Sequence, residues 1–321
     1  MHHLFEALPC EKRALFLRTA LNKALISSLL HLLEVAEDVF SPETYQRSLE
    51  KLRSLNPEKK FSSFLYALNT AFSQAIMKED IEKIQIIVQN IIENRFQIEG
   101  INFLSVKDIP PYYCELFEQS SSFEIPGGAT FTGSSPAGHQ RIKSLFQQGL
   151  DLISKSCEDL YKEIQVFLGE ILTFDSPQMK YGSSFNLFGL IYIRETFPFD
   201  TIADVVDALA HETGHIHLYS LSADDPLVLN PPEERYPAPL RKDLRPLIGI
   251  YHASFVVSRV LYALRALYRH KLLSEDDQTR CATLIEEYKL KYTLGLETIQ
   301  KHAKMTSLGQ DILNSTMKLA S

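Results

Sequence analysis

The sequence is poor in cysteine, and its cysteines form no closely spaced pair. The chain has 321 residues and four cysteines, which lie far apart with no CxxC motif: Cys10, Cys114, Cys157 and Cys281. A disulfide framework or a zinc knuckle needs clustered or regularly spaced cysteines. We therefore expect four ordinary reduced thiols, which excludes both kinds of scaffold.

Long apolar runs and a basic leader segment are also missing. The stretch 24–33 is interrupted by Ser27, Ser28 and His31, whereas a membrane span needs roughly 18 consecutive apolar residues. The first residues, MHHLFEALPCEKR, lack the basic patch and the apolar core of a signal peptide. We expect a cytoplasmic protein with no membrane partner.

The sequence contains fewer basic than acidic residues. Lysine and arginine total 33 against 40 acidic residues, for a formal net charge of −7. A general nucleic-acid binder needs a basic surface to neutralise phosphates. The composition therefore argues against a nucleic-acid partner, while the length allows one large domain or two ordinary ones.

Apolar residues recur at spacings of three and four over most of the chain, which predicts amphipathic helices. The expected helices cover residues 11–40, 61–77, 80–98, 139–168, 201–220, 246–271 and 275–304, with a further helix from Pro42. Aromatic and β-branched residues at 185–194 predict one short strand. The predicted fold class is mainly α with a small β-sheet (α+β).

Residues 105–138 are rich in Gly, Ser, Thr and Pro and predict an irregular connection. Gly127 and Gly128 are followed by neither GK[ST] nor GxGxxG, so a flexible loop or lid is favoured over a phosphate cradle. We expect a helical N-terminal region at 1–135 and a catalytic region at 136–321, which can also form one continuous domain.

One short motif carries chemistry. His211, Glu212 and His215 form HExxH in the segment ALAHETGHIHLYS. Residues four apart share one helix face, so both imidazoles can bind one metal ion, and the glutamate can reach a metal-bound water. His217 falls on another face and is not expected to be a ligand.

A metal site of this kind needs a third protein ligand from another element. Glu233 and Glu234 lie in the proline-rich segment NPPEER, which holds a ligand poorly. His252 is the stronger candidate because it is a polar residue in a strongly apolar predicted helix. A core histidine bonded to a carbonyl is the alternative.

Several arginines surround this candidate ligand in sequence. Arg259 follows His252 by two helical turns and so shares its face. Its guanidinium can grip a ligand carboxylate beyond the metal, or it can pair with a buried Glu or Asp. Arg241 and Arg245, near the start of the same helix, are further candidate cations.

The segments ALAHETGHIHLYSL and YPAPLRKDLRPLIGIYHASFVVSRV resemble those of the HExxH-type α-ketoglutarate-dependent peptide β-hydroxylases, which modify ribosomally synthesised peptides. The resemblance covers roughly residues 183–261, including FGLIYIR before the motif. It implies Fe(II) held by His211, His215 and His252, with α-ketoglutarate and O2 as cosubstrates. It also implies that Arg259, Arg245 or Arg241 binds the distal carboxylate of α-ketoglutarate.

Two other functions fit the motif. One is a zinc-dependent peptidase of zincin type, with the HExxH helix near a short strand and Glu212 as the general base. The other is a binding protein with a purely structural metal site. For either enzyme we expect a peptide substrate docked along the strand 188–194 by β-augmentation.

Overall fold

The structure is a computed structural model that describes residues 5–121, 129–238, 243–271 and 273–320. Helices make up 66% of it, and the described residues form 11 α-helices with small sheets. The predicted mainly helical α+β class is therefore confirmed.

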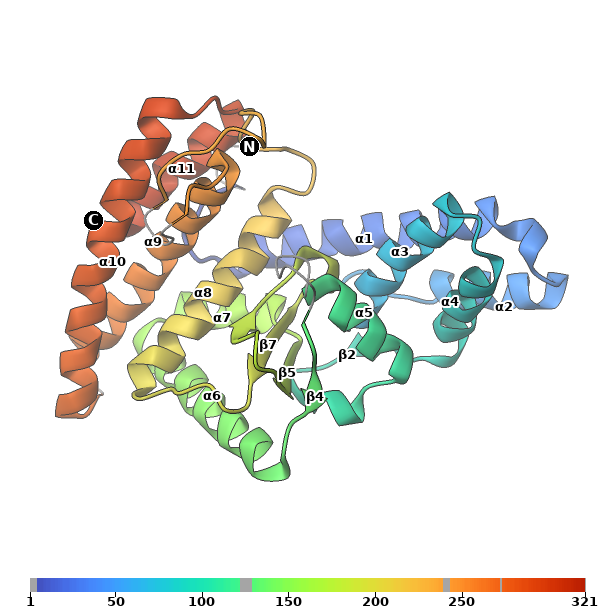
Figure 1. Cartoon of the computed structure of the whole chain (residues 1–321), viewed down its shortest axis with the longest axis horizontal. Coiled ribbons are helices and arrows are strands. Elements are labelled where there is room, and N and C mark those ends of the chain that lie inside the picture. Colours follow the sequence, from blue (N-terminus) through green and yellow to red (C-terminus); the bar gives the residue numbers. More distant parts are fainter. Residues whose placement is uncertain (1–4, 122–128, 239–242, 272, 321) are drawn as a thin grey trace. The chain divides into compact units, whose positions relative to one another are not determined.

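The chain divides into two compact units, each assembled from separated segments (Figure 1). The first unit consists of 1–14, 140–164 and 197–321, and the second of 15–139 and 165–196. The sequence instead predicts one boundary near residue 135. Each unit is described by itself below.

The first unit is a bundle of helices that carries the HExxH motif. Its helices are α6 (Pro136–Ser156), which begins in the second unit, α7 (Glu158–Phe167), α8 (Ile202–Leu221), α9 (Leu247–His270), α10 (Glu275–His302) and α11 (Ser307–Ala320). Helix α9 packs against α8, α10 and α11, and α10 also packs against α8. Figure 1 shows α9 and α10 running side by side.

Helix α8 begins at a capping box. The Thr201 hydroxyl accepts a bond from the Asp204 backbone N–H at 3.3 Å, and the Asp204 carboxylate accepts from the Thr201 N–H at 3.0 Å. These reciprocal bonds satisfy two N–H groups that a helix start leaves without partners. Thr201 is therefore the cap residue of this helix.

A glycine within the motif allows α8 to approach α9 closely. A Cβ atom built on Gly214 would lie 3.4 Å from Val256 Cγ2 and 3.6 Å from its Cα. The α8 backbone therefore lies almost directly on α9 at the level of the motif. This close approach brings the neighbouring His252 toward the motif.

Helix α9 is strongly apolar. By length and composition alone it could cross a membrane, with a mean hydropathy of 1.5 over its most apolar window. However, 72% of that window is buried in the structure. Such burial is also typical of the central helix of a globular bundle.

The second unit combines helices with a small, mostly parallel sheet. Its strands β3 (Asn102–Ser105), β5 (Glu170–Asp175), β7 (Leu190–Arg194) and β6 (Tyr181–Gly182) follow that order, and β4 (Thr132–Gly133) also pairs with β5. The β3–β5 and β5–β7 pairs are parallel, with Asn102 opposite Glu170 and Glu170 opposite Leu190. The strands β1 (Lys60–Phe61) and β2 (Gln97–Ile98) form a separate antiparallel pair.

The helices of the second unit enclose its apolar core. They are α1 (Glu11–Val35), which begins in the first unit, α2 (Pro42–Arg53), α3 (Ser63–Met77), α4 (Ile81–Glu93) and α5 (Pro111–Ser121), with the short 3-10 turns η2 (Glu37–Val39), η3 (Val106–Asp108) and η4 (Phe185–Leu187). The core includes fully buried Phe72, Phe117 and Phe174.

Strand β7 is an inner strand, which changes the expectation for peptide docking. Its residues pair with β5 along their whole length, and Tyr192 and Ile193 also pair with Gly182 and Tyr181 of β6. Those two residues therefore present no unpaired backbone edge to a peptide. A substrate strand cannot pair with these two residues, because β-augmentation needs an exposed edge. Docking elsewhere along 188–194 stays a prediction.

Candidate metal centre

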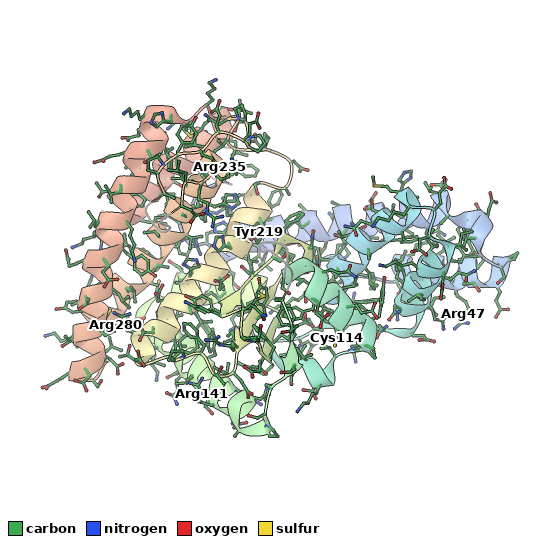
Figure 2. The ribbon with its side chains drawn as sticks, viewed as in Figure 1. Arg47, Cys114, Arg141, Tyr219, Arg235 and Arg280 are labelled. Atoms are coloured by element: carbon green, nitrogen blue, oxygen red, sulfur yellow. The ribbon has the colours of Figure 1, made fainter. Side chains whose placement is uncertain are left out.

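Four polar or aromatic side chains follow one face of α8. Asp207, His211, His215 and Tyr219 are spaced by four residues, so they lie in one row along the helix. Figure 2 shows Tyr219 near the C-terminal end of this helix. The row contains both histidines of the HExxH motif, with Asp207 one turn before His211 and Tyr219 one turn after His215.

Histidine rings from two helices gather at this row. The ring centres of His211 and His215 are 5.1 Å apart, and those of His215 and His252 are 6.4 Å apart. The Tyr219 ring lies 6.1 Å from His215 and 6.3 Å from His252. The third ligand predicted from the sequence, His252 on α9, therefore lies beside His215 of the motif.

The surroundings favour neutral imidazoles, the form that binds a metal. Burial, with the neighbouring His211 and His252 rings, lowers the pKa of His215 well below its ordinary value. Burial lowers the pKa of His252 to about 4. The Nδ1 atom of His215 is also buried with no hydrogen-bond partner, an unusual state that a bound ion or water can explain.

The distances between the imidazole ring centres decide whether one metal ion can bind all three histidines. With metal–nitrogen bonds of about 2.0–2.1 Å, two imidazoles on one ion have ring centres roughly 4.5–5.5 Å apart. The His211–His215 pair meets this spacing, whereas His252 must turn inward by about 1 Å. Consistently, no three His, Cys, Asp or Glu side chains among the described residues are already arranged to hold an ion. The residue types, and the lowered pKa values of His215 and His252, fit a divalent metal once His252 turns.

The three glutamates that the sequence offers for this site differ in burial and in hydrogen-bond partners. Glu212 is buried in α8, at 4% exposed. The carboxylate of Glu234 accepts bonds from the hydroxyl of Tyr236 and the amide of Asn230, and Glu233 is exposed. Glu234 is therefore held by its own loop.

Arg259 has a protein partner inside the unit. Its guanidinium is 1% exposed, forms an ion pair with Glu163 of α7 and donates to the Ala7 carbonyl at 2.5 Å. His217 is fully buried, with Nδ1 3.5 Å from the same Glu163 carboxylate and its ring 5.7 Å from the Phe255 ring. Of the two interpretations open for Arg259, this geometry supports the buried ion pair over a grip on a ligand.

Arg245 is in a more accessible position. Its side chain is 35% exposed, and Nε lies 2.9 Å from a carboxylate oxygen of Asp243, whose side chain is 62% exposed. A solvent-exposed ion pair of this kind contributes little and is easily exchanged. Arg241 lies outside the described residues, as do residues 122–128 of the expected lid.

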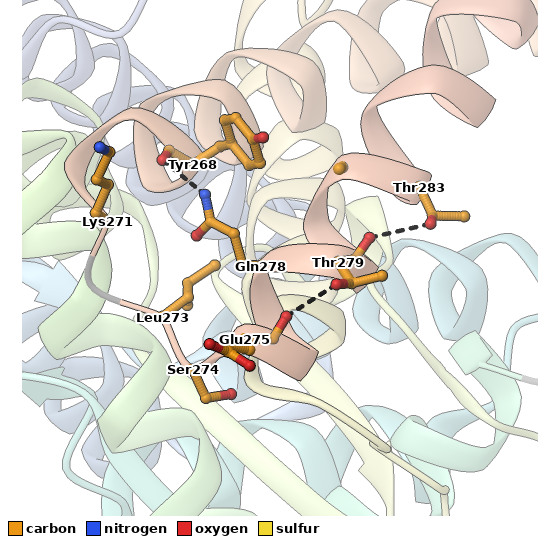
Figure 3. Close-up of a pocket in the computed structure, with 9 residues that line it drawn as sticks. Tyr268, Lys271, Leu273, Ser274, Glu275, Gln278, Thr279 and Thr283 are labelled. Atoms are coloured by element: carbon orange, nitrogen blue, oxygen red, sulfur yellow. Dashed lines mark hydrogen bonds between the residues drawn. The ribbon is translucent and has the colours of Figure 1, made fainter.

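A pocket of about 740 Å³ lies away from these histidines, where α9 ends and α10 begins (Figure 3). Its wall includes Tyr268, Lys271 and Gln278, and the Gln278 amide donates to the Tyr268 carbonyl at 3.2 Å. The pocket is open to solvent, and none of the predicted site residues is among its described lining.

Sequence reasoning did not identify three residues of this region. Asp207 and Tyr219 could have been found, because the four-residue spacing of HExxH extends to both of them. Glu163 gives no such signal, because it is one of several charged residues in an amphipathic helix. Its burial against Arg259 appears only in the folded chain.

No protein-family model matches this chain, and no curated protein sequence matches it.

Proposed function

We propose that the chain is an Fe(II)- and α-ketoglutarate-dependent oxygenase that hydroxylates the β-carbon of a residue in a peptide substrate. The observation that carries the proposal is that His215 lies between His211 on its own helix and His252 on α9, since a metal centre needs a third ligand from a second element. The resemblance of 183–261 to the HExxH-type peptide β-hydroxylases favours iron and a keto acid over zinc.

Three imidazoles leave several coordination positions of the ion open, as an oxygenase requires. When bound, Fe(II) would supply the oxidising chemistry, with oxygen and the keto acid as cosubstrates. His211, His215 and His252 would hold the ion as neutral ligands. Their depressed pKa values mean that no proton has to leave His215 or His252 at neutral pH.

The keto acid also needs a cation for its distal carboxylate. Arg259 is already paired with buried Glu163, so we assign this task to Arg245, which is paired with the exposed carboxylate of Asp243. The planar guanidinium of Arg245 can bind a carboxylate through two parallel hydrogen bonds. Arg241, in the same segment, is the second candidate.

Glu212 has a different role in this proposal from the one it has in a hydrolase. In an oxygenase it has no water to activate, and it would orient a ligand beside the ion. A zinc peptidase would use the same glutamate as its general base. Because Arg259 is paired with Glu163, one of the three arginines proposed to bind the keto acid is already occupied. The zinc peptidase therefore stays a second candidate function.

The test is α-ketoglutarate turnover. The protein is loaded with Fe(II) without oxygen, oxygen and α-ketoglutarate are added, and succinate is followed by mass spectrometry. We expect succinate from the wild type and from a His270→Ala control, which alters an exposed histidine at the end of α9. His211→Ala should abolish it. Zinc-dependent peptide cleavage that is lost in Glu212→Gln, without succinate, would contradict the proposal.

A further inference from the structure

Asp207 begins the row of side chains that contains the two motif histidines, one helical turn before His211. Side chains on a helix tilt toward its N-terminus, so the His211 ring leans over the turn that carries Asp207. Residues spaced by four are close enough for direct side-chain contact. The helix therefore places the carboxylate of Asp207 one turn before the first predicted metal ligand, within reach of its ring.

Helix α10 holds this carboxylate in place. The hydroxyl of Tyr288 lies 3.0 Å and 2.8 Å from the two oxygens of Asp207. The Tyr288 ring is itself fixed: the residue is 9% exposed, and the Lys291 ammonium lies 4.7 Å from its centre. One hydroxyl proton uses one acceptor position of a carboxylate that has about four. Asp207 thus keeps acceptor capacity for a second donor.

We propose that Asp207, held by Tyr288, accepts a hydrogen bond from Nδ1–H of His211 and so directs Nε2 of that ring toward the metal. The inference rests on the proposed metal centre and names a positioning residue for it. Histidine ligands commonly donate their second ring nitrogen to a carboxylate, which fixes the tautomer and the ring orientation.

The charges around Asp207 are consistent with this arrangement. Asp204, one turn earlier, forms an ion pair with Arg280 of α10 at 2.9 Å, and this pair largely compensates its negative charge. Figure 2 shows Arg280 beside the start of α8.

The test measures Zn²⁺ affinity by competition with a chelator. Asp207→Ala should weaken zinc binding about 10- to 100-fold, the usual effect of losing a partner of a ligand. Asp207→Asn, which keeps an acceptor oxygen, should lose less, and Tyr288→Phe should lie between the wild type and Asp207→Ala. The control is Asp204→Asn, which damages the start of α8 but should leave zinc affinity unchanged.

Two outcomes would overturn the inference while the metal centre stands: Asp207→Ala binds zinc as tightly as the wild type, or Asp204→Asn weakens binding as much. A wild-type protein that binds no zinc, iron or cobalt would instead remove the metal centre and this inference together. A second measurement needs no variant. Nitrogen-15 NMR of the metal-free wild type should show His211 as the Nδ1–H tautomer, and the Nε2–H tautomer would overturn the inference.

Discussion

Arg259 of α9 and Glu163 of α7 form an ion pair in which the two side chains are only 1% and 2% exposed. The same carboxylate accepts the backbone N–H of Cys10 at 3.0 Å and lies 3.5 Å from His217 of α8. One buried carboxylate thus joins the N-terminal segment to three helices of the first unit. This network lies on a different face of α8 from the row of His211 and His215.

Removing one member of this ion pair should destabilise the protein strongly. Arg259→Met or Glu163→Gln leaves an uncompensated buried partner, and we expect a loss of about 3–5 kcal/mol in the free energy of unfolding. The measurement is urea denaturation. The control is Asp151→Asn, which breaks an exposed pair with Lys155 and should cost about 1 kcal/mol or less. An Arg259→Met variant of normal stability but raised KM for α-ketoglutarate would show that Arg259 binds the keto acid.

The size of the side chain at position 214 should control the approach of α8 to α9. Gly214→Ala adds a methyl that reaches ordinary contact distance from Val256, and alanine favours a helix by about 1 kcal/mol. We expect stability within about 1 kcal/mol of the wild type. Gly214→Leu overfills the contact and should cost about 1–3 kcal/mol.

The same pair of variants should differ in metal binding. Gly214→Leu separates the helices that carry His215 and His252, so its zinc affinity should fall, whereas Gly214→Ala should retain it. Thermal unfolding and chelator competition measure the two effects. Unchanged zinc affinity in Gly214→Leu would mean that the helix spacing does not set the ligand geometry.

Lys60 should make stability depend on pH in the alkaline range. Its ammonium is buried and donates to the carbonyls of Gly100 and Leu168 at 2.8 Å and 2.7 Å. Burial, with a smaller contribution from Arg18, lowers the pKa of Lys60 from 10.5 to about 8. Between these values the unfolded state binds more protons, so the free energy of unfolding should rise with pH.

The check is denaturation at several pH values between 8 and 10.5 for the wild type and for Lys60→Met. The variant should lack the wild-type rise over this window. Lys59→Met, at an exposed neighbouring position, is the control and should keep it. Parallel curves for wild type and Lys60→Met would show that the buried ammonium keeps its ordinary pKa.

The helices of the first unit could be predicted from sequence because their apolar spacing and caps agree. Thr201 and Asp204 form the expected type of helix start, and α8, α9 and α10 lie within a few residues of their predicted ranges. The predicted helix 139–168 is divided into α6 and α7 at Cys157. Helix α11 lies beyond the predicted ranges, which end at residue 304.

The sheet was predicted less completely. The sequence does not predict β5, because this strand is buried along nearly its whole length and shows no alternation of polar and apolar residues. It also does not predict β3, a partly buried edge strand of four residues. Only β7 of the predicted strand 185–194 is extended, since Phe185–Leu187 forms a 3-10 turn. Helix α5 was missed inside a segment that resembles a loop in composition.

The candidate metal ligands are easier to predict than their surroundings. His211 and His215 follow from helix periodicity, and His252 from its isolation among apolar residues. The partner of Arg259 could not be predicted, because it depends on which acidic side chain the fold buries beside it. Helix periodicity predicts which residues share one face of a helix. Which helix faces pack against each other depends on contacts between residues far apart in the sequence.

The most direct test of the metal centre is X-ray absorption spectroscopy of the protein loaded with Fe(II) under anaerobic conditions, for the wild type and His252→Ala. The account predicts scattering from three imidazoles in the wild type and from two in the variant, because His252 is the ligand from α9. An identical imidazole count in both proteins, or a wild-type protein that retains no iron, would contradict it.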